Sequence, residues 1–279
     1  MIMKELAPDT GRAHVLGLTG APGVGKSTTA TSLVGALRSR GERVGVLAVD
    51  PSSPFSGGAL LGDRVRMQEH ALDPDVFIRS MATRGHLGGL AVATPQALRA
   101  FDAAGFDTVI VETVGVGQSE LEVAETADTI LVLLAPGMGD GIQAAKAGIL
   151  EIGDIFVVNK SDREGAQALV RELRTMIALA HRNPHDWKPP IVTTVANEHR
   201  GIDDLLEAVD RFRASQADTG SAQKRRVARA RGEVESIALA KLRAELQLNG
   251  EARLDDLAEA VSRGELDAYT AADRVVLGL

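Results

Sequence analysis

The sequence predicts an α/β fold in which a doubly wound, mostly parallel sheet carries helices on both faces and is followed by a C-terminal helical extension. Two observations carry this prediction. Over the first two thirds of the chain, short β-branched runs alternate with stretches of helical length, which is the order of a parallel sheet with helical crossovers. The β-branched runs are almost continuously apolar, as expected of strands that are buried on both faces.

The elements of the sheet domain follow one another in a regular order. We expect strands at His14–Thr19, Arg43–Val49, Val76–Ser80, Thr108–Glu112, Thr129–Ala135, Ile155–Asn159 and Ile191–Ala196. The longer stretches between them predict helices at Lys26–Arg40, Pro95–Ala104, Gly141–Leu150 and Glu164–His181. Right-handed crossovers would place these helices on the two faces of one sheet.

The pattern changes after Phe212, where the strand-like runs end. Small and polar residues at 215–223 indicate a linker. Apolar residues at helical spacing then predict one helix over Lys224–Leu248, with a stop at Asn249–Gly250. Two shorter helices are expected at Leu254–Arg263 and Tyr269–Leu279. The expected organisation is a short N-terminal segment (1–12), a nucleotide-binding domain (13–214), the linker (215–223) and a helical extension (224–279) that forms a dimer.

The composition excludes several classes of protein. The chain of 279 residues has no Cys, which excludes disulfide frameworks, thiol nucleophiles and Cys-ligated metals. The net charge of −7 and the 3% of aromatic residues argue against a nucleic-acid binder. No apolar run approaches the roughly 20 residues of a membrane span, and Met1–Gly11 does not resemble a signal peptide. We therefore expect a cytoplasmic protein with no nucleic-acid or membrane partner.

A phosphate-binding motif follows the first expected strand and precedes the first expected helix. The residues fit G-x-x-x-x-G-K-[ST] and are followed by Thr28; they are Gly20, Ala21, Pro22, Gly23, Val24, Gly25, Lys26 and Ser27. Glycines let backbone N–H groups face phosphate oxygens, and the helix N-terminus adds partial positive charge. Lys26 would reach the β- and γ-phosphates, and the Ser27 hydroxyl would ligate Mg²⁺. This context predicts a P-loop NTPase.

Two acidic residues at the ends of expected strands are candidates for the Mg²⁺ site. Asp50 ends the second expected strand, and Glu112 ends the run that begins at Thr108. Glu112-Thr-Val-Gly115 is a variant of D-x-x-G with Glu in the acidic position. In that pattern, the N–H of Gly115 can bond the γ-phosphate, so the loop senses whether a tri- or diphosphate is bound.

A third motif identifies the base. Asn159-Lys-Ser-Asp162 is N-K-x-D and follows another strand. The Asp162 carboxylate can accept two hydrogen bonds from guanine, whereas adenine lacks that pair of donors. The stem of Lys160 can cover the face of the base. The stretch Val195-Ala196-Asn197, at the end of the last strand, is placed to supply a backbone N–H to the guanine carbonyl oxygen. The sequence therefore predicts GTP and GDP as ligands.

Taken together, these motifs resemble one family. The matching runs are Gly20–Thr28, Ala48–Pro54, Gly62–Met67, Glu112–Ser119 and Asn159–Asp162. They are similar to the MeaB/ArgK family of P-loop GTPases, which is grouped with the metallochaperone GTPases and includes proteins similar to human MMAA. The resemblance implies a GTPase chaperone of adenosylcobalamin-dependent methylmalonyl-CoA mutase that gates cofactor loading, protects the mutase and is a homodimer.

The resemblance also implies roles for particular residues, and of the stretch Val195–Asn197 it carries over only Ala196 as a guanine contact. Asp50, Asp63 and Glu112 would surround the Mg²⁺, and Asp50 or Asp63 could position the attacking water. The stretch Pro51–Gln68 would be a mobile switch, and Pro136–Lys146 a further switch that contacts the mutase. By contrast, the residues alone indicate only a Gly-rich connection at Pro136–Lys146.

Hydrolysis without a partner is expected to be slow. Many GTPases have a water-orienting Gln directly after D-x-x-G, but Val116 occupies that position and Gln118 lies two residues further on. Two alternatives remain open: a nickel-type metallochaperone GTPase, and a kinase that transfers the γ-phosphoryl group. Against the first, His181 and His185 are separated by the helix breaker Pro184. The basic run at 224–231 is interpreted as the solvated face of a helix.

Overall fold

The computed structural model describes residues 5–50, 67–82, 93–113, 123, 126–137, 150–179 and 187–276. Among these, the side chains of residues 50, 68, 82, 150, 240, 242–253 and 276 are outside the described part. The chain divides into two compact units, Met1–Arg229 and Ala230–Leu279, and each is described by itself.

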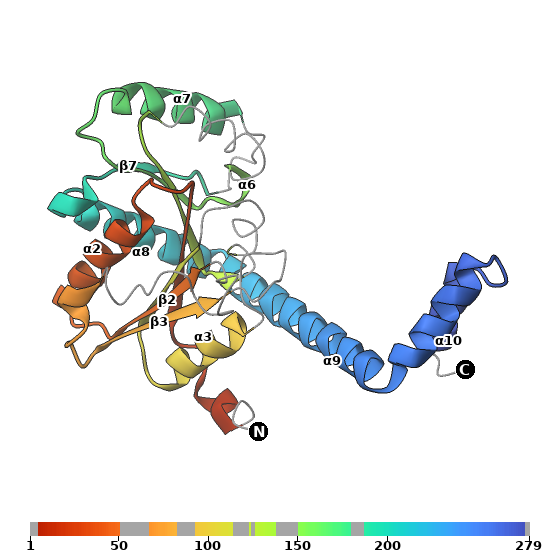
Figure 1. Ribbon diagram of the computed structural model, residues 1–279. Helices are drawn as coiled ribbons and strands as arrows, with labels where there is room; N and C mark the ends of the chain where they lie inside the picture. Colours follow the sequence, from red (N-terminus) through yellow and green to blue (C-terminus); the bar gives the residue numbers. More distant parts are fainter. Residues whose placement is uncertain are drawn as a thin grey trace. The chain divides into compact units, whose positions relative to one another are not determined.

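A seven-stranded parallel sheet forms the centre of the first unit (Figure 1). Its strands are β1 (His14–Thr19), β2 (Val44–Asp50), β3 (Val76–Ala82), β4 (Thr108–Glu112), β5 (Thr129–Leu134), β6 (Ile155–Val158) and β7 (Ile191–Thr193). They lie in the order β3-β2-β4-β1-β5-β6-β7, and every described pairing is parallel. The predicted fold class is therefore confirmed, with small differences at the strand ends.

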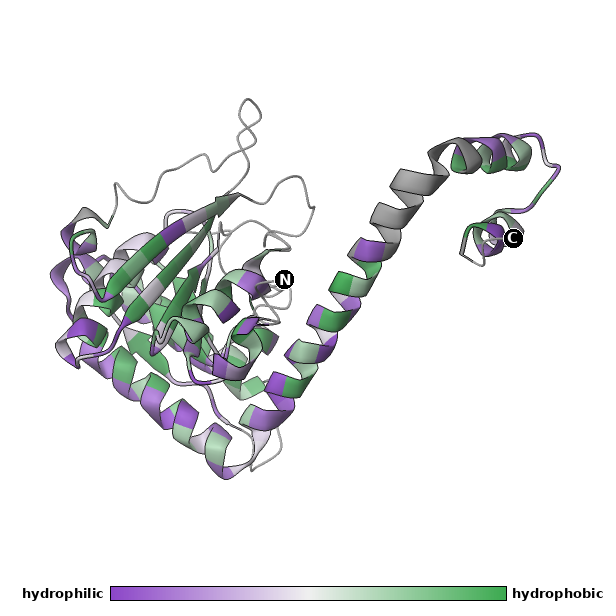
Figure 2. Ribbon diagram, turned by 90° about the horizontal axis from the view of Figure 1, so that it is seen from below, coloured by the Kyte–Doolittle hydropathy of each residue, from purple (hydrophilic) through white to green (hydrophobic). Residues whose placement is uncertain are grey.

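Helices cover both faces of this sheet because the strands bury alternate side chains on opposite sides. On β1, Leu16 and Leu18 belong to one core cluster and Val15 to the other. The first cluster includes α2 (Lys26–Ser39) and α8 (Ile202–Asp218), and the second includes α3 (Thr94–Ala103) and α7 (Ala166–Leu179). Figure 2 shows the apolar strands between helices whose outer residues are hydrophilic. Double burial explains the nearly continuous apolar runs in the sequence.

The order of the strands creates a switch point beside β1. After β1 the chain builds β2, β3 and β4 on one side, and β5, β6 and β7 on the other. In sheets of this kind, ligands bind at the carboxyl ends of the strands near such a point. The fold therefore brings the carboxyl ends of β1, β4, β6 and β7 to one edge, and with them the described residues of the phosphate-binding and base motifs.

Several predicted boundaries differ from the structure. The apolar spacing of Ile202, Leu205, Val209 and Phe212 forms α8, which the sequence analysis did not predict. Within the predicted linker 215–223, α8 continues to Asp218 and α9 (Ser221–Ser262) begins after a turn at Gly220. Of the predicted helix Gly141–Leu150, only its last residue is described, as the start of α6 (Leu150–Ile152).

The second unit contains the rest of α9 together with α10 (Ala268–Val276). The predicted stop at Asn249–Gly250 is wrong, since α9 continues to Ser262. A single Gly costs a helix only about 1 kcal/mol relative to Ala, which a helix of 42 residues tolerates. Three short 3₁₀ helices complete the described elements: η1 (Ala7–Asp9), η3 (Gln68–His70) and η5 (Ala196–Glu198).

The basic run 224–231 is not only a solvated face. Arg225 donates two hydrogen bonds to the buried carboxylate of Asp154, at 3.0 and 2.9 Å. Arg229 pairs with Asp128 and donates to the carbonyl of Thr126 at 2.8 Å. These bonds attach the first turns of α9 to the sheet, so the sequence interpretation is wrong for these two arginines.

No helix in the described part of the chain has the length and apolar character needed to cross a membrane.

Candidate nucleotide-binding site

The loop between β1 and α2 has a conformation that depends on glycine. Gly20, Gly23 and Gly25 have φ values of 140°, 81° and 99°, a region that other residues avoid. A Cβ at Gly20 would lie 2.2 Å from the carbonyl oxygen of Leu133, and one at Gly25 would lie 2.4 Å from Nδ2 of Asn159. The loop therefore packs against the Leu133 backbone and the Asn159 side chain and has no room for a Cβ at these two positions, as a phosphate cradle requires.

Lys26 begins α2 directly after this loop, and its residue is only 6% exposed. Its Nζ donates to the carbonyl oxygens of Gly20 (2.7 Å) and Ala21 (3.2 Å). The ammonium group is therefore held over the loop beside the N-terminus of α2, where two positive contributions coincide. This position suits a lysine that contacts the phosphates of a bound nucleotide.

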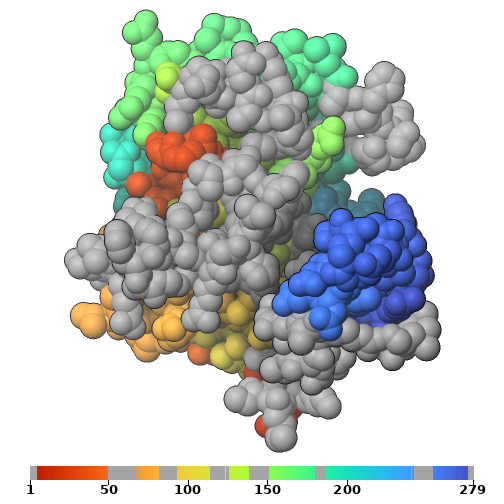
Figure 3. Space-filling model, turned by 45° about the vertical axis from the view of Figure 1, so that its right-hand side comes forward, coloured from red at the N-terminus to blue at the C-terminus, as the bar shows by residue number. Residues whose placement is uncertain are grey.

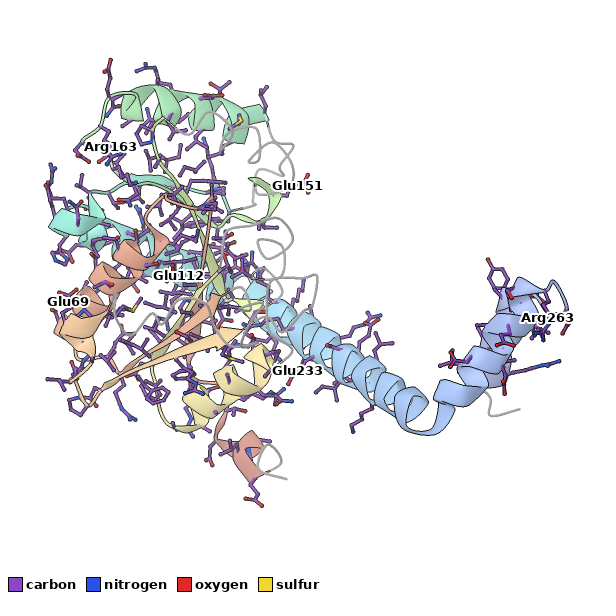
Figure 4. All side chains as sticks on the ribbon, viewed as in Figure 1. Glu69, Glu112, Glu151, Arg163, Glu233 and Arg263 are labelled. Carbon is purple, nitrogen blue, oxygen red and sulfur yellow. The ribbon has the colours of Figure 1, made fainter. Side chains whose placement is uncertain are left out.

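Ser27 and Glu112 come together at the carboxyl ends of β1 and β4. The Ser27 hydroxyl donates to Oε1 of Glu112 at 2.5 Å, and Glu112 is buried (Figure 4). A hydroxyl and a carboxylate are oxygen ligands of the kind that Mg²⁺ prefers, so these two residues fit the predicted metal. Glu112 thus occupies the position where a D-x-x-G sequence would place Asp.

The other predicted metal and phosphate residues are described only in part. Asp50 is the last residue of β2, and Ala48 of the same strand pairs with Glu112 on β4. The backbone therefore places Asp50 at the same edge, but its side chain lies outside the description. Asp63 and Gly115 lie outside the described residues, as do Val116 and Gln118. Their roles stay predictions.

Asn159 joins the base motif to the phosphate loop. Its Nδ2 donates to the Val24 carbonyl at 2.9 Å. Its Oδ1 accepts the Thr194 hydroxyl and the Ala196 N–H, both at 3.1 Å. The side chain is 3% exposed, and it connects three separate loops. The Ala196 N–H, which the sequence analysis offered to guanine, is thus bonded to Asn159 in this structure.

Lys160 and Asp162 lie on the outer side of this junction. Lys160 has a φ of 55° and donates from Nζ to the Gly23 carbonyl at 2.7 Å. Its aliphatic stem therefore spans from the base motif to the phosphate loop, while Asp162 is exposed. In Figure 3 the red-orange surface of the first segments borders the green surface of the later ones. These contacts bring together the predicted residues Gly20–Ser27, Glu112, Asn159, Lys160 and Ala196.

One contact at this site involves a residue that the sequence analysis missed. The buried hydroxyl of Ser32, on α2, donates to the carbonyl oxygen of Ala196 at 2.6 Å. The two residues are 164 positions apart in the chain. A single Ser inside a helix carries no sequence signal that would have identified this partner.

Within the described residues, no three His, Asp or Glu side chains form a group able to hold a metal ion by themselves. His181 and His185, considered for the nickel alternative, lie outside the described part. A Mg²⁺ here would depend on the nucleotide phosphates in addition to Ser27 and Glu112.

Comparison with known proteins agrees with the motifs. A family model described as methylmalonyl Co-A mutase-associated GTPase MeaB matches residues 1–251. A Pyrococcus horikoshii protein named as a GTPase is 46% identical over 278 residues, which are 99% of this chain and 87% of that protein. The Escherichia coli GTPase ArgK is 39% identical over 226 residues, covering 80% of this chain and 68% of its own length. The Mus musculus mitochondrial protein named methylmalonic aciduria type A homolog is 38% identical over 214 residues, covering 76% and 52% of the two chains.

Solved structures with similar folds also occur. A structure described as an LAO/AO transport system kinase has a TM-score of 0.72 at 28% identity, covering 99% of this chain and 84% of that one. HypB from Helicobacter pylori, in complex with nickel, has a TM-score of 0.54 at 16% identity, covering 76% and 92% of the two chains. The likeness to HypB at this identity shows a shared fold only.

Proposed function

The chain belongs to the MeaB family of methylmalonyl-CoA mutase-associated GTPases, and we propose that it acts as a GTP-dependent chaperone of an adenosylcobalamin-dependent methylmalonyl-CoA mutase. In this role it gates the loading of the cofactor and protects the mutase. The protein works as a homodimer through its helical extension, where α9 exposes Val234 and Leu239. Light scattering of a Val234→Glu variant tests the dimer, because a charge on that surface should separate the two copies.

The observation that carries the GTPase part is the junction at Asn159. One side chain bonds the phosphate loop at Val24 and the loop after β7 at Thr194 and Ala196. A nucleotide spanning from phosphates to base would therefore meet a site whose two halves are already connected. Such preorganisation lowers the cost of ordering the loops on binding.

Each residue of the site then has a role in nucleotide binding. Lys26 contacts the phosphates, and the Ser27 hydroxyl with the Glu112 carboxylate holds Mg²⁺, which would neutralise phosphate charge when bound. Gly115 senses the γ-phosphate, and Asp50 and Asp63 complete the metal site or orient water. Unaided hydrolysis is slow because Val116 stands where many GTPases have a Gln.

Asp162 determines the choice of base in this proposal, and Asp162→Asn tests it. The carboxylate accepts two hydrogen bonds from guanine. An amide replaces one acceptor by a donor, which suits the 2-oxo group of xanthine. We expect the affinity for GTP to fall at least about 10-fold while the affinity for XTP rises, as measured by equilibrium binding.

The matched control is Glu164→Gln, an exposed acid two residues away. It removes the same charge and should leave the preference unchanged. If Asp162→Asn keeps the preference for GTP over XTP, the base assignment is wrong. A phosphorylated acceptor in place of free phosphate would favour the kinase alternative, and stoichiometric nickel binding would favour the metallochaperone.

A further inference from the structure

The contact between α2 and the loop after β7 has a consequence for base selection. We propose that Ser32 is a positioning residue that fixes the Ala196–Asn197 peptide so that the Asn197 N–H faces the 6-oxo group of the purine base. This rests on the proposed GTP binding and adds a residue outside the sequence motifs.

The Ser32 hydroxyl has one proton and two neighbouring carbonyl oxygens. The Ala196 oxygen lies 2.6 Å away and the Thr28 oxygen, in the preceding turn of α2, lies 3.1 Å away. The shorter contact is the better hydrogen bond for an O–H donor. Ser32 is 3% exposed, so this bond does not exchange readily with water. The helix that begins with Lys26 is therefore bonded directly to the loop beside the base motif.

The carbonyl of Ala196 is held by two donors. Besides Ser32, it accepts the N–H of His199 at 3.1 Å. The peptide unit is planar and trans, so its N–H points opposite to its C=O. Fixing the Ala196 oxygen on the α2 side therefore also fixes the direction of the Asn197 N–H, on the side away from Ser32.

Among the backbone amides of this turn, the Asn197 N–H is the one that remains available to a ligand. The Ala196 N–H donates to Asn159 (3.1 Å), the Glu198 N–H to Val195 (2.9 Å) and the His199 N–H to Ala196 (3.1 Å). Within the described residues, the Asn197 N–H makes no hydrogen bond, and Asn197 is exposed. Since Asn159 occupies the Ala196 N–H, the donor to guanine within the predicted stretch Val195–Asn197 is the amide of Asn197.

A fixed N–H donor discriminates between purines by their 6-substituent. Guanine and hypoxanthine carry an accepting oxygen there, whereas adenine carries a donating amine that would face the N–H. The Asp162 carboxylate would bind the other edge of the base, where guanine carries its 2-amino group. Ser32 and Asp162 thus control separate atoms, and a change at Ser32 should alter the affinity only for nucleotides that carry the 6-oxygen.

The experiment measures equilibrium affinities of the full chain for GTP, ITP and 2-aminopurine riboside triphosphate. ITP lacks only the 2-amino group, whereas the third nucleotide lacks the 6-oxygen and, with it, the proton on N1. For Ser32→Ala we expect affinity for GTP and ITP to fall about 10-fold, since the peptide is no longer fixed. Affinity for the nucleotide without the 6-oxygen should change less than about 2-fold, because that contact is already absent.

Three further variants make the result specific. Ser39→Ala removes a hydroxyl that bonds only within α2, to Gly35 at 2.9 Å, and should change nothing. Ser32→Thr keeps the hydroxyl. The ratio of its affinity for GTP to its affinity for the 2-aminopurine nucleotide should return to within about 3-fold of the original. Ser32→Cys keeps the size with a weak donor, and it replaces Ser32→Ala if that variant does not fold.

The outcomes are distinct. Equal losses for all three nucleotides would show that Ser32 only supports the fold, and would overturn the inference. No change for any nucleotide would overturn it as well. If the unaltered chain binds ATP as tightly as GTP, the proposed function fails, whatever Ser32 does.

Discussion

The two edges of the central sheet use charged side chains in opposite ways. At the carboxyl edge, Lys26 and Lys160 donate to backbone carbonyls of the phosphate loop. At the amino edge, charges neutralise one another: Arg225 bonds Asp154, and Arg229 bonds Asp128. A nucleotide phosphate can replace the backbone carbonyls as the hydrogen-bond partner of a lysine. By contrast, an ion pair whose charges neutralise each other leaves no charge for a ligand. The comparison indicates that the first edge serves binding and the second stability.

The amino edge is more than a set of ion pairs. Oδ2 of Asp154 also accepts the N–H of Ile130 at 2.9 Å, and Arg225 lies over the ring of Phe212 at 5.2 Å. Trp187 packs edge-on against Phe212 and donates from Nε1 to the Asp154 carbonyl at 2.8 Å. Burial raises the pKa of the Asp154 carboxyl, and the bonds from Arg225 counteract part of that rise.

The largest effect on the free energy of unfolding is expected from Arg225→Met, at the amino edge. The variant keeps most of the aliphatic stem but leaves the Asp154 carboxyl, 6% exposed, without its partner. We expect the free energy of unfolding to fall by about 3 kcal/mol, at the low end for buried pairs because Arg225 is 40% exposed. Denaturant unfolding, followed by the fluorescence of the single Trp187, measures this loss.

Arg40→Met is the matched control, because Arg40 and Asp210 form a pair that is 35% and 53% exposed. Its loss should stay below about 1 kcal/mol. Equal losses in the two variants would refute the assignment of stability to the amino edge. The same comparison predicts that folded Arg225→Met binds GTP with unchanged affinity.

At the carboxyl edge, Lys26→Ala should impair the hydrolysis and the binding of the nucleotide. It removes the charge that Nζ holds over the phosphate loop. We expect GTP hydrolysis to fall about 100-fold or more, equivalent to about 2.7 kcal/mol of barrier, and nucleotide binding to weaken. Phosphate release in single turnovers measures the rate. A variant that hydrolyses GTP normally would exclude Lys26 from the phosphate site.

A smaller effect on the free energy of unfolding is expected from the protonation of His14, which begins β1 at the amino edge. Its Nε2 lies 3.1 Å from the Thr129 hydroxyl, and burial, with Arg213 nearby, lowers its pKa from 6.5 to about 4. The unfolded chain therefore takes up this proton first as the pH falls. The contribution of His14 is complete above about pH 6.5 and decreases toward pH 4, with about 2 kcal/mol lost between pH 7 and 5.

Comparison with His14→Gln isolates this loss from other titrating groups. The variant should show a shallower decrease of unfolding free energy over the same pH range, whereas His199→Asn, at an exposed His, should follow the original chain. Parallel pH curves for His14→Gln and the original chain would contradict the assignment.

The sequence could predict the features of the fold that depend on residues close together in the chain. The strands and the phosphate loop are determined by local features: strands buried on both faces are apolar runs, and the positive φ values at Gly20 and Gly25 require glycine. The spacing of Ile202, Leu205 and Val209 would have revealed α8. These signals lie within a few residues of one another, so a single chain displays them.

Long-range pairs could not be predicted in this way. Arg225 and Asp154 are 71 positions apart, and Ser32 and Ala196 are 164 apart. Nothing near Arg225 distinguishes it from its neighbours in the basic run. Similarly, the bond from Ala196 to Asn159 depends on how β6 and β7 end side by side, which only the assembled sheet reveals.

We propose that the carboxyl edge of the sheet hydrolyses GTP in response to a mutase. The most direct measurement is single-turnover GTP hydrolysis by the full chain, alone and with adenosylcobalamin-dependent methylmalonyl-CoA mutase. We predict slow hydrolysis that the mutase accelerates at least about 10-fold, as expected when a partner reorders the catalytic loops. Fast hydrolysis by the chain alone, or a rate that the mutase leaves unchanged, would contradict the claim.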